Sequence, residues 1–337
     1  EILKKLGEER ALILGLFLIL FSTNDEIFAQ YMRRKSTKKF VSSQMHQSLG
    51  QDVPELQEPP APTTLAHSMP SHPKKNEVPN SNSGAEAYVT LVTTNKYVIG
   101  AEVLATCLLA FNVTRPLVAL VDSTITDEGR KRLVQAGWSV RGIAHVPNPN
   151  MVRVRDRPWF NTTFSKLHIF GLEDLQRIVY LDSDLLVLEN LDSLFDQDLE
   201  DPDMPFAAAS EVFPPDSFNS GVLVVRPDAG AYERLLDAAP GLASYDGSDQ
   251  GFLNRFYERW WEAPAGHRLA FRYNVQQTVA MYYHPGWEAL ACGDMAIMHF
   301  SGDDSMKPWS FAGVVPPSLA AFLRLWQEIA RGGRGAP

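Results

Sequence analysis

The sequence predicts an α/β domain with a mostly parallel central sheet of the doubly wound, Rossmann-like type. Short β-branched apolar stretches alternate with helical patterns from residue 87 onward, and such alternation is typical of a parallel sheet. Hydrophobic residues make up 45% of the 337 residues and charged residues 21%, which excludes a wholly disordered chain. Ligands of such folds bind beyond the carboxyl ends of the strands, so functional residues are expected in the loops there.

The first residues, 1–27, differ in composition from the folded part. They contain an unbroken apolar run, 11–21, that follows basic residues and precedes acidic ones. This run is shorter than the ~20 residues of a membrane span, so we expect an apolar leader or a signal anchor. We therefore expect a type II protein of the Golgi membrane and lumen, with the cytoplasm as the alternative. The chain begins with Glu1 rather than Met, which leaves room for a segment upstream.

Residues 28–86 lack apolar periodicity and are rich in Pro, Ser, Gln and His. This composition predicts a disordered stem, which is followed by a folded domain over residues 87–331. The basic cluster at 33–39 is either a solvated charge run or a contact for acidic lipid headgroups.

Charge and cysteine content exclude two classes of protein. The 31 Lys and Arg residues against 40 Asp and Glu give a net charge of −9, so no nucleic-acid partner is expected. The two cysteines, Cys107 and Cys292, each lie in an apolar stretch. We expect two buried free thiols rather than a disulfide framework.

The elements of the folded domain follow one another in a regular order. Strands are expected at residues 87–93, 117–121, 138–146, 177–181, 222–225 and 296–299. Helices are expected at residues 97–110, 126–136 and 252–260. Thr126 supplies a capping hydroxyl for the second helix, and Gly137 lies just after its end, where a left-handed residue is favoured.

Two carboxylates follow the strand at 177–181. Asp182 and Asp184 are separated by Ser183, and a second apolar stretch begins directly after them. Two negative charges at the end of a buried strand are costly to desolvate, so a hard cation such as Mg²⁺ or Mn²⁺ is their natural partner. An Asp-rich turn that caps the next element is the alternative. A phosphatase is disfavoured, because Leu186 stands where that class usually has Thr or Val.

Small polar residues adjoin two further apolar segments. Asn219 and Ser220 precede the strand at 222–225 in an Asn-Ser-Gly triplet, which indicates either a ligand contact or a plain turn. The segment 245–251 opens the helix at 252–260 with two aspartates and an amide. These groups cap the helix and also suit sugar hydroxyls, which require several convergent polar partners.

His299 ends the last expected strand, and Lys307 follows it in the next loop. A single His at a strand end is usually structural, but together with an Asp-x-Asp sequence it can complete a metal site. Lys307 offers a point charge for a phosphate.

These pieces resemble, in order along the chain, the family-8 retaining glycosyltransferases, which include glycogenin and the plant glucuronosyltransferases of xylan synthesis. The likeness covers residues 87–309. It rests on Thr90-Leu91-Val92-Thr93-Thr94, Arg157-Pro158 with Lys166-Leu167-His168, Asp182-Ser183-Asp184, Asn219-Ser220-Gly221, residues 246–251, and His299-Phe300-Ser301-Gly302 with Lys307-Pro308-Trp309. The resemblance implies a Rossmann-like nucleotide-diphospho-sugar transferase fold of the GT-A type, with residues 87–331 as the catalytic domain.

The resemblance also implies roles for individual residues. Asp182, Asp184 and His299 match the ligands of a Mn²⁺ ion, which Mg²⁺ could replace. Donor-binding positions of the UDP-sugar match Leu91, Thr93, Tyr97, Arg157, Lys166, Asp182, Ser183, Asn219, Ser220, Asp246, Gly302 and Lys307. For catalysis the candidates are Asp249 and Gln250 near the anomeric carbon and Lys307 near the diphosphate.

The function implied is that of a Mn²⁺-dependent hexosyltransferase, which moves a hexose or hexuronic acid from a UDP-sugar to a saccharide acceptor. A glycogenin-type self-glucosylating initiator and a non-catalytic fold that binds sugar nucleotides are alternatives. Met281 stands at the acceptor position of the self-glucosylating members, and the neighbouring Tyr282 and Tyr283 are expected to be pocket or core aromatics. The loop from Gly302 to Lys307 is longer than in glycogenin, which leaves the contact made by Lys307 open.

Two features bear on the compartment and the assembly. Asn112 and Asn161 begin N-glycosylation sequons, which are used only in a luminal protein. The N-terminal apolar segment is a candidate membrane contact. The oligomeric state does not follow from the sequence, and a homodimer is one option.

Overall fold

The computed structural model describes residues 85–151, 158–291, 294–312 and 314–332. The expected leader and nearly all of the expected stem lie outside the described residues, so these two expectations stay predictions. In the described ranges, no helix has the length and apolar character needed to cross a membrane.

A seven-stranded mixed sheet forms the centre of the molecule, with the strand order β3-β2-β1-β4-β7-β6-β8. Its strands are β1 (Glu86–Val92), β2 (Leu117–Val121), β3 (Ser139–Gly142), β4 (Arg177–Leu181), β6 (Phe206–Ser210), β7 (Phe218–Val225) and β8 (Arg268–Leu269). The four pairs β3-β2, β2-β1, β1-β4 and β6-β8 are parallel. Only β7 runs antiparallel to both of its neighbours, so the sheet is mostly parallel, as predicted.

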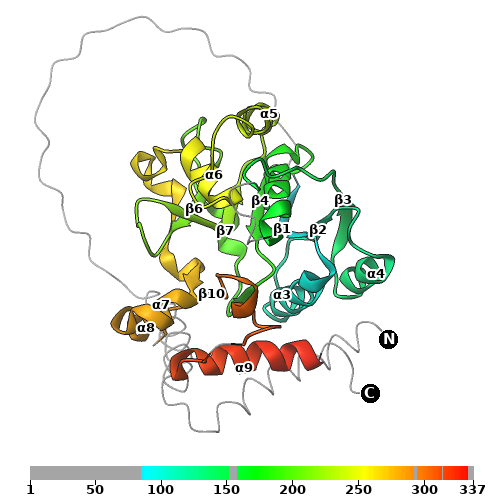
Figure 1. Cartoon of the computed structure of the whole chain (residues 1–337), viewed down its shortest axis with the longest axis vertical. Helices are drawn as coiled ribbons and strands as arrows, with labels where there is room; N and C mark the ends of the chain where they lie inside the picture. Colours follow the sequence, from blue (N-terminus) through cyan, green and yellow to red (C-terminus); the bar gives the residue numbers. More distant parts are fainter. Residues whose placement is uncertain (1–84, 152–157, 292–293, 313, 333–337) are drawn as a thin grey trace, which may run out of the picture.

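Helices cover both faces of this sheet (Figure 1). The covering helices are α3 (Val98–Ala110), α4 (Asp127–Gln135), α5 (Ala229–Ala238), α6 (Asp249–Phe256), α9 (Pro317–Gly332) and the 3₁₀ segment η2 (Pro158–Gly171). Two further helices, α7 (Gln277–Tyr282) and α8 (His284–Ala291), lie outside this sheet, and α7 contacts α9. Neighbouring strand residues point to opposite faces, so Tyr88 packs in the core beneath α3 and α9, whereas Val89 packs in the core beneath η2, α5 and α6.

A second, three-stranded sheet joins β5 (Leu185–Val187), β10 (Ile297–His299) and β9 (Val275–Gln276) in the order β5-β10-β9. Its strand β5 starts immediately after Asp184. Because β10 runs antiparallel to β5, His299 pairs with Leu185, and the Phe300 amide donates to the Asp184 carbonyl over 3.0 Å. Pairing in the small sheet therefore places the end of β10 beside the Asp-x-Asp sequence.

The end signals of the second predicted helix are confirmed. The Thr126 hydroxyl accepts a hydrogen bond from the Gly129 amide at 3.2 Å, and Gly137 has a φ of 107°. Cys107 is a buried free thiol, as expected, and burial raises its pKa to about 12. Cys292 lies outside the described residues.

Three predicted boundaries were wrong. The strand expected at 138–146 is only β3, which covers four residues. The helix expected at 252–260 is α6, because the Ser248 side chain accepts from the Gln250 amide and starts the helix at Asp249. The Asn-Ser-Gly triplet does not precede its strand but lies inside β7.

Candidate active site

A cavity of about 730 Å³ opens at one edge of the central sheet. It lies where β1, β4 and β6 end and where the antiparallel β7 begins, as the strand order requires. The cavity is lined by the predicted residues Leu91, Thr93, Tyr97, Lys166, Asp182, Ser183, Asp184, Asn219, Ser220, Asp246, Asp249, Gln250, His299, Gly302 and Lys307. Arg157 lies outside the described residues. The fold thus gathers residues that are up to 216 positions apart in the sequence, from Leu91 to Lys307.

Asp182, Asp184 and His299 form a cluster that could hold a metal ion in the middle of the cavity. One ligand atom from each lies within 4.8 Å of the others. Asp182 and Asp184 flank Ser183 directly after the end of β4, and His299 comes from β10, which runs antiparallel to β5. Two carboxylates and an imidazole are donors that suit Mn²⁺ and other divalent ions.

A chain of amide hydrogen bonds fixes the orientation of the His299 ring. The Gly221 amide donates to Asn219 Oδ1 at 2.9 Å, so the NH₂ group of Asn274 must be the donor in its 2.8 Å bond to the same oxygen. The amide oxygen of Asn274 then faces His299 Nδ1 at 2.8 Å. Because this oxygen can only accept, Nδ1 carries the proton. Nε2 faces Asp184 instead, 3.3 Å from its Oδ1, and is the ring nitrogen that a metal ion in the cluster could contact.

Gly221 lets the His299 ring approach β7 closely. A Cβ at position 221 would lie 2.4 Å from Cε1 of His299. Glycine is therefore required here by the packing of a metal-site residue.

Lys307 forms an ion pair with the buried Asp184 of the cluster. Its Nζ lies 2.5 Å from Asp184 Oδ2 and 3.2 Å from the Phe300 carbonyl oxygen. Burial alone would raise the pKa of Asp184, but the ammonium of Lys307 and, after it, the neighbouring ring of His299 outweigh burial and hold this pKa well below its usual value. Asp184 is therefore a carboxylate at neutral pH, and the longer loop after Gly302 still returns Lys307 to the cavity.

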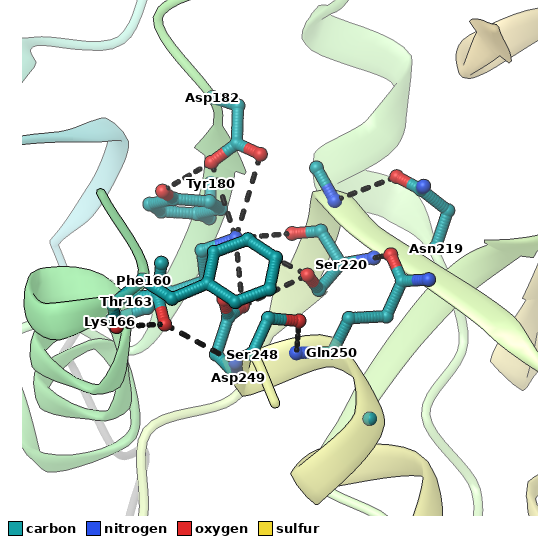
Figure 2. A network of polar contacts seen from close by, with 12 residues as sticks. Phe160, Thr163, Lys166, Tyr180, Asp182, Asn219, Ser220, Ser248, Asp249 and Gln250 are labelled. Atoms are coloured by element: carbon teal, nitrogen blue, oxygen red, sulfur yellow. Dashed lines mark hydrogen bonds and ion pairs between the residues drawn. The ribbon is translucent and has the colours of Figure 1, made fainter. Parts of the chain in front are cut away.

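Lys166 lies at the centre of a second charged group (Figure 2). From η2 its Nζ reaches Asp182 Oδ1 at 3.2 Å, Asp249 Oδ2 at 2.9 Å and the Ser220 carbonyl at 3.2 Å. Burial lowers the pKa of Lys166, but the two carboxylates reverse that effect and raise it above its usual value. Lys166 therefore holds Asp182 and Asp249 in place as a permanent cation.

Two further residues of the predicted donor set lie between β1 and α3: Thr93 directly follows β1, and Tyr97 directly precedes α3. The Tyr97 hydroxyl donates to Asp304 Oδ1 at 3.1 Å, and its ring packs edge-on against Trp309 at a centroid distance of 4.9 Å. Thr93 donates its hydroxyl hydrogen to Thr162 at 2.7 Å. Burial and nearby carboxylates raise the pKa of Tyr97, so its hydroxyl remains a hydrogen-bond donor.

The opposite end of the cavity contains Glu211, which the sequence did not reveal. Its Oε2 accepts from the side-chain amides of Asn219 at 3.0 Å and Gln250 at 2.9 Å. The only local signal is a carboxylate at the end of a strand, which is too common to be informative. Asp246 differs from expectation in its partners, because its carboxylate accepts from Ser244, Ser248 and Gly251 and so shapes its own loop.

Comparison with known proteins agrees with this geometry. The family model described as glycosyl transferase family 8 matches residues 88–313. Glycogenin-1 of Caenorhabditis elegans is 38% identical over 248 residues, which cover 73% of this chain and 55% of that protein. A putative UDP-glucuronate:xylan alpha-glucuronosyltransferase 3 of Arabidopsis thaliana is 33% identical over 198 residues, or 58% of this chain and 30% of that protein.

Solved structures show the same fold. The galactosyltransferase LgtC, in complex with donor and acceptor sugar analogues, superposes with a TM-score of 0.54 at 18% identity and covers 74% of this chain and 97% of that chain. This chain spans about half the length of the C. elegans glycogenin. The fold is of the GT-A type, and the matched family model shows that the chain belongs to glycosyl transferase family 8.

Proposed function

We propose that this glycosyltransferase is Mn²⁺-dependent and retaining, and that it moves a hexose or hexuronic acid from a UDP-sugar to a saccharide acceptor. The observation that carries the proposal is the cluster of Asp182, Asp184 and His299 in the middle of the cavity. The residues fit a divalent ion, because Nε2 of His299 lies 3.3 Å from Oδ1 of Asp184, and the Asp184 side chain is an ionised carboxylate. A bound ion would supply Lewis-acid stabilisation of the UDP leaving group.

The strand order supports one direction for the donor. Along the sheet edge lie Leu91 near the end of β1, Asp182 after β4, Ser220 in β7 and Glu211 after β6. The four strands β1, β4, β7 and β6 are consecutive in the sheet, so the three distances between neighbouring strands add up to about 14 Å. We place the nucleoside beside Leu91, the diphosphate near the metal cluster and the sugar beside Glu211.

The chain's own residues then have distinct roles in the proposed reaction. Lys307 faces the developing negative charge of the diphosphate. The carboxylate of Asp249 and the amide oxygen of Gln250 face the sugar, where they support the oxocarbenium-like anomeric carbon. Release of UDP from a panel of UDP-sugars, measured with Mn²⁺ and with EDTA, tests this proposal. Turnover that persists unchanged in EDTA would refute the metal requirement.

One observation favours a second function, self-glucosylation. The sequence led us to expect Tyr282 and Tyr283 to be pocket or core aromatics, and this expectation was wrong. The exposed fractions of the two side chains are 82% and 61%. Both hydroxyls are therefore accessible to a second molecule. We still favour a separate saccharide acceptor, because Met281 stands at the position where the resemblance implies an acceptor tyrosine.

Purified protein incubated with labelled UDP-glucose and no acceptor is expected to leave its polypeptide unlabelled. Intact-mass measurement before and after incubation, with UDP release as the control for activity, checks this result. Hexose additions that map to Tyr282 or Tyr283 and vanish in Y282F/Y283F would establish the self-glucosylating function instead.

We further propose that the domain faces the lumen of the Golgi, and one sequon tests this. Asn112 is exposed in the turn after α3, with a φ of 54°, and is thus accessible for modification. The full-length protein expressed in eukaryotic cells is expected to lose mass on treatment with peptide N-glycosidase, with Asn112 converted to Asp. An unmodified Asn112 in the mature protein would contradict a luminal location.

A further inference from the structure

The cavity is unevenly charged along its length. One end of the cavity lies beside β6, β7 and α6, and we call it the sugar end. It is lined by Glu211, Asn219, Asp246, Asp249 and Gln250. Lys166 forms an ion pair with Asp249. In the described part of the chain, neither Glu211 nor Asp246 has an ion-pair partner within 4.0 Å. Among the described residues that line the sugar end, acidic side chains therefore outnumber basic ones.

Glu211 is held firmly in this position by neutral donors. Asn219 and Gln250 donate their side-chain amides to Oε2, and the Val212 amide donates to Oε1 at 2.9 Å. Figure 2 shows Asn219 and Gln250 beside Ser220 at the edge of the network around Lys166. Such donors orient a carboxylate without cancelling its charge, and a carboxylate has about four acceptor positions. Glu211 can therefore accept a further hydrogen bond from a ligand in the cavity.

From this arrangement we infer that the sugar end selects a neutral hexose over a hexuronic acid, and that Glu211 is a specificity-determining residue. The hydroxyl groups of a neutral hexose donate hydrogen bonds to a fixed carboxylate. A hexuronate would bring a second carboxylate beside Glu211 and Asp246, and like charges in a partly desolvated site repel strongly. The inference rests on the proposed function, because it takes the sugar to lie beside Glu211.

The test is calorimetric titration of the protein in Mn²⁺ with UDP, UDP-glucose and UDP-glucuronate. The wild type, E211Q and D216N are compared. Gln keeps the shape of Glu211 and removes its charge. Asp216 is an exposed carboxylate in the same β6–β7 connection that does not line the cavity, so D216N is the matched control. Thermal unfolding confirms that each variant is folded.

The wild type is expected to bind UDP-glucose at least about tenfold more tightly than UDP-glucuronate. E211Q should narrow this ratio while its affinity for UDP stays unchanged, and D216N should leave the ratio as it is. Equal or tighter binding of UDP-glucuronate by the wild type, or a ratio that E211Q does not change, would overturn the inference while leaving the proposed function intact. Failure of the wild type to bind UDP at all would overturn both.

Discussion

Asp184→Asn is expected to lower Mn²⁺-dependent release of UDP from a UDP-sugar by roughly a thousandfold. The substitution removes one of the two carboxylates of the proposed metal site. It also leaves the buried ammonium of Lys307 without its charge partner, which lies 2.5 Å from Asp184 Oδ2 in the wild type. Steady-state UDP release at saturating Mn²⁺ measures the effect.

Two controls separate loss of chemistry from loss of folding. D184N/K307M removes both members of the buried pair, so it should be more stable than D184N and yet remain inactive. Asp174→Asn breaks a surface ion pair in which the Asp174 side chain is 58% exposed, and it should change neither stability nor turnover appreciably. A well-folded D184N variant with nearly wild-type turnover would rule out Asp184 as a metal ligand.

Lys166→Met is expected to cost about 3 kcal/mol of unfolding free energy, because it leaves the buried carboxylate of Asp249 and the partly buried carboxylate of Asp182 without their cation. In the wild type, the ammonium of Lys166 lies within 3.2 Å of both Asp182 Oδ1 and Asp249 Oδ2. Chemical denaturation monitored by tryptophan fluorescence gives the change.

The K166M/D249N double variant distinguishes an ion-pair effect from a packing effect. If charge pairing dominates, D249N should restore part of the stability lost in K166M, since it removes one of the two carboxylates that have lost their cation. A double variant as unstable as the sum of its single changes would show that Lys166 acts through packing. The rate of UDP release should be lower than that of the wild type in both K166M and K166M/D249N, because Asp182 loses the cation that orients it.

Much of the fold and the site was predictable because its signals are local. Apolar β-branched runs marked β1, β2 and β4, and the Asp-x-Asp sequence directly followed the last of them. A buried parallel strand must be apolar on both faces, and its carboxyl end is where polar residues become functional. The positions of Asp182 and Asp184 therefore follow from one segment of sequence.

Long-range pairing accounts for what the sequence could not reveal. Asn219 and Ser220 were expected before a strand because polar residues are usually absent from buried strands, yet pairing of Phe218 with Ser210 starts β7 earlier. The same pairing brings Glu211 into the cavity. His299 reaches Asp184 only because β10 pairs antiparallel with β5, a contact between segments more than 100 residues apart. No local pattern encodes such a register.

Anomalous diffraction at the manganese absorption edge, from crystals grown with MnCl₂ and UDP, tests the central claim most directly. We expect a single strong peak within coordination distance of Asp182, Asp184 and His299, with the uracil beside Tyr97 and the diphosphate between the metal and Lys307. A manganese peak elsewhere in the cavity, or UDP bound with these three side chains unliganded, would contradict the donor site described above.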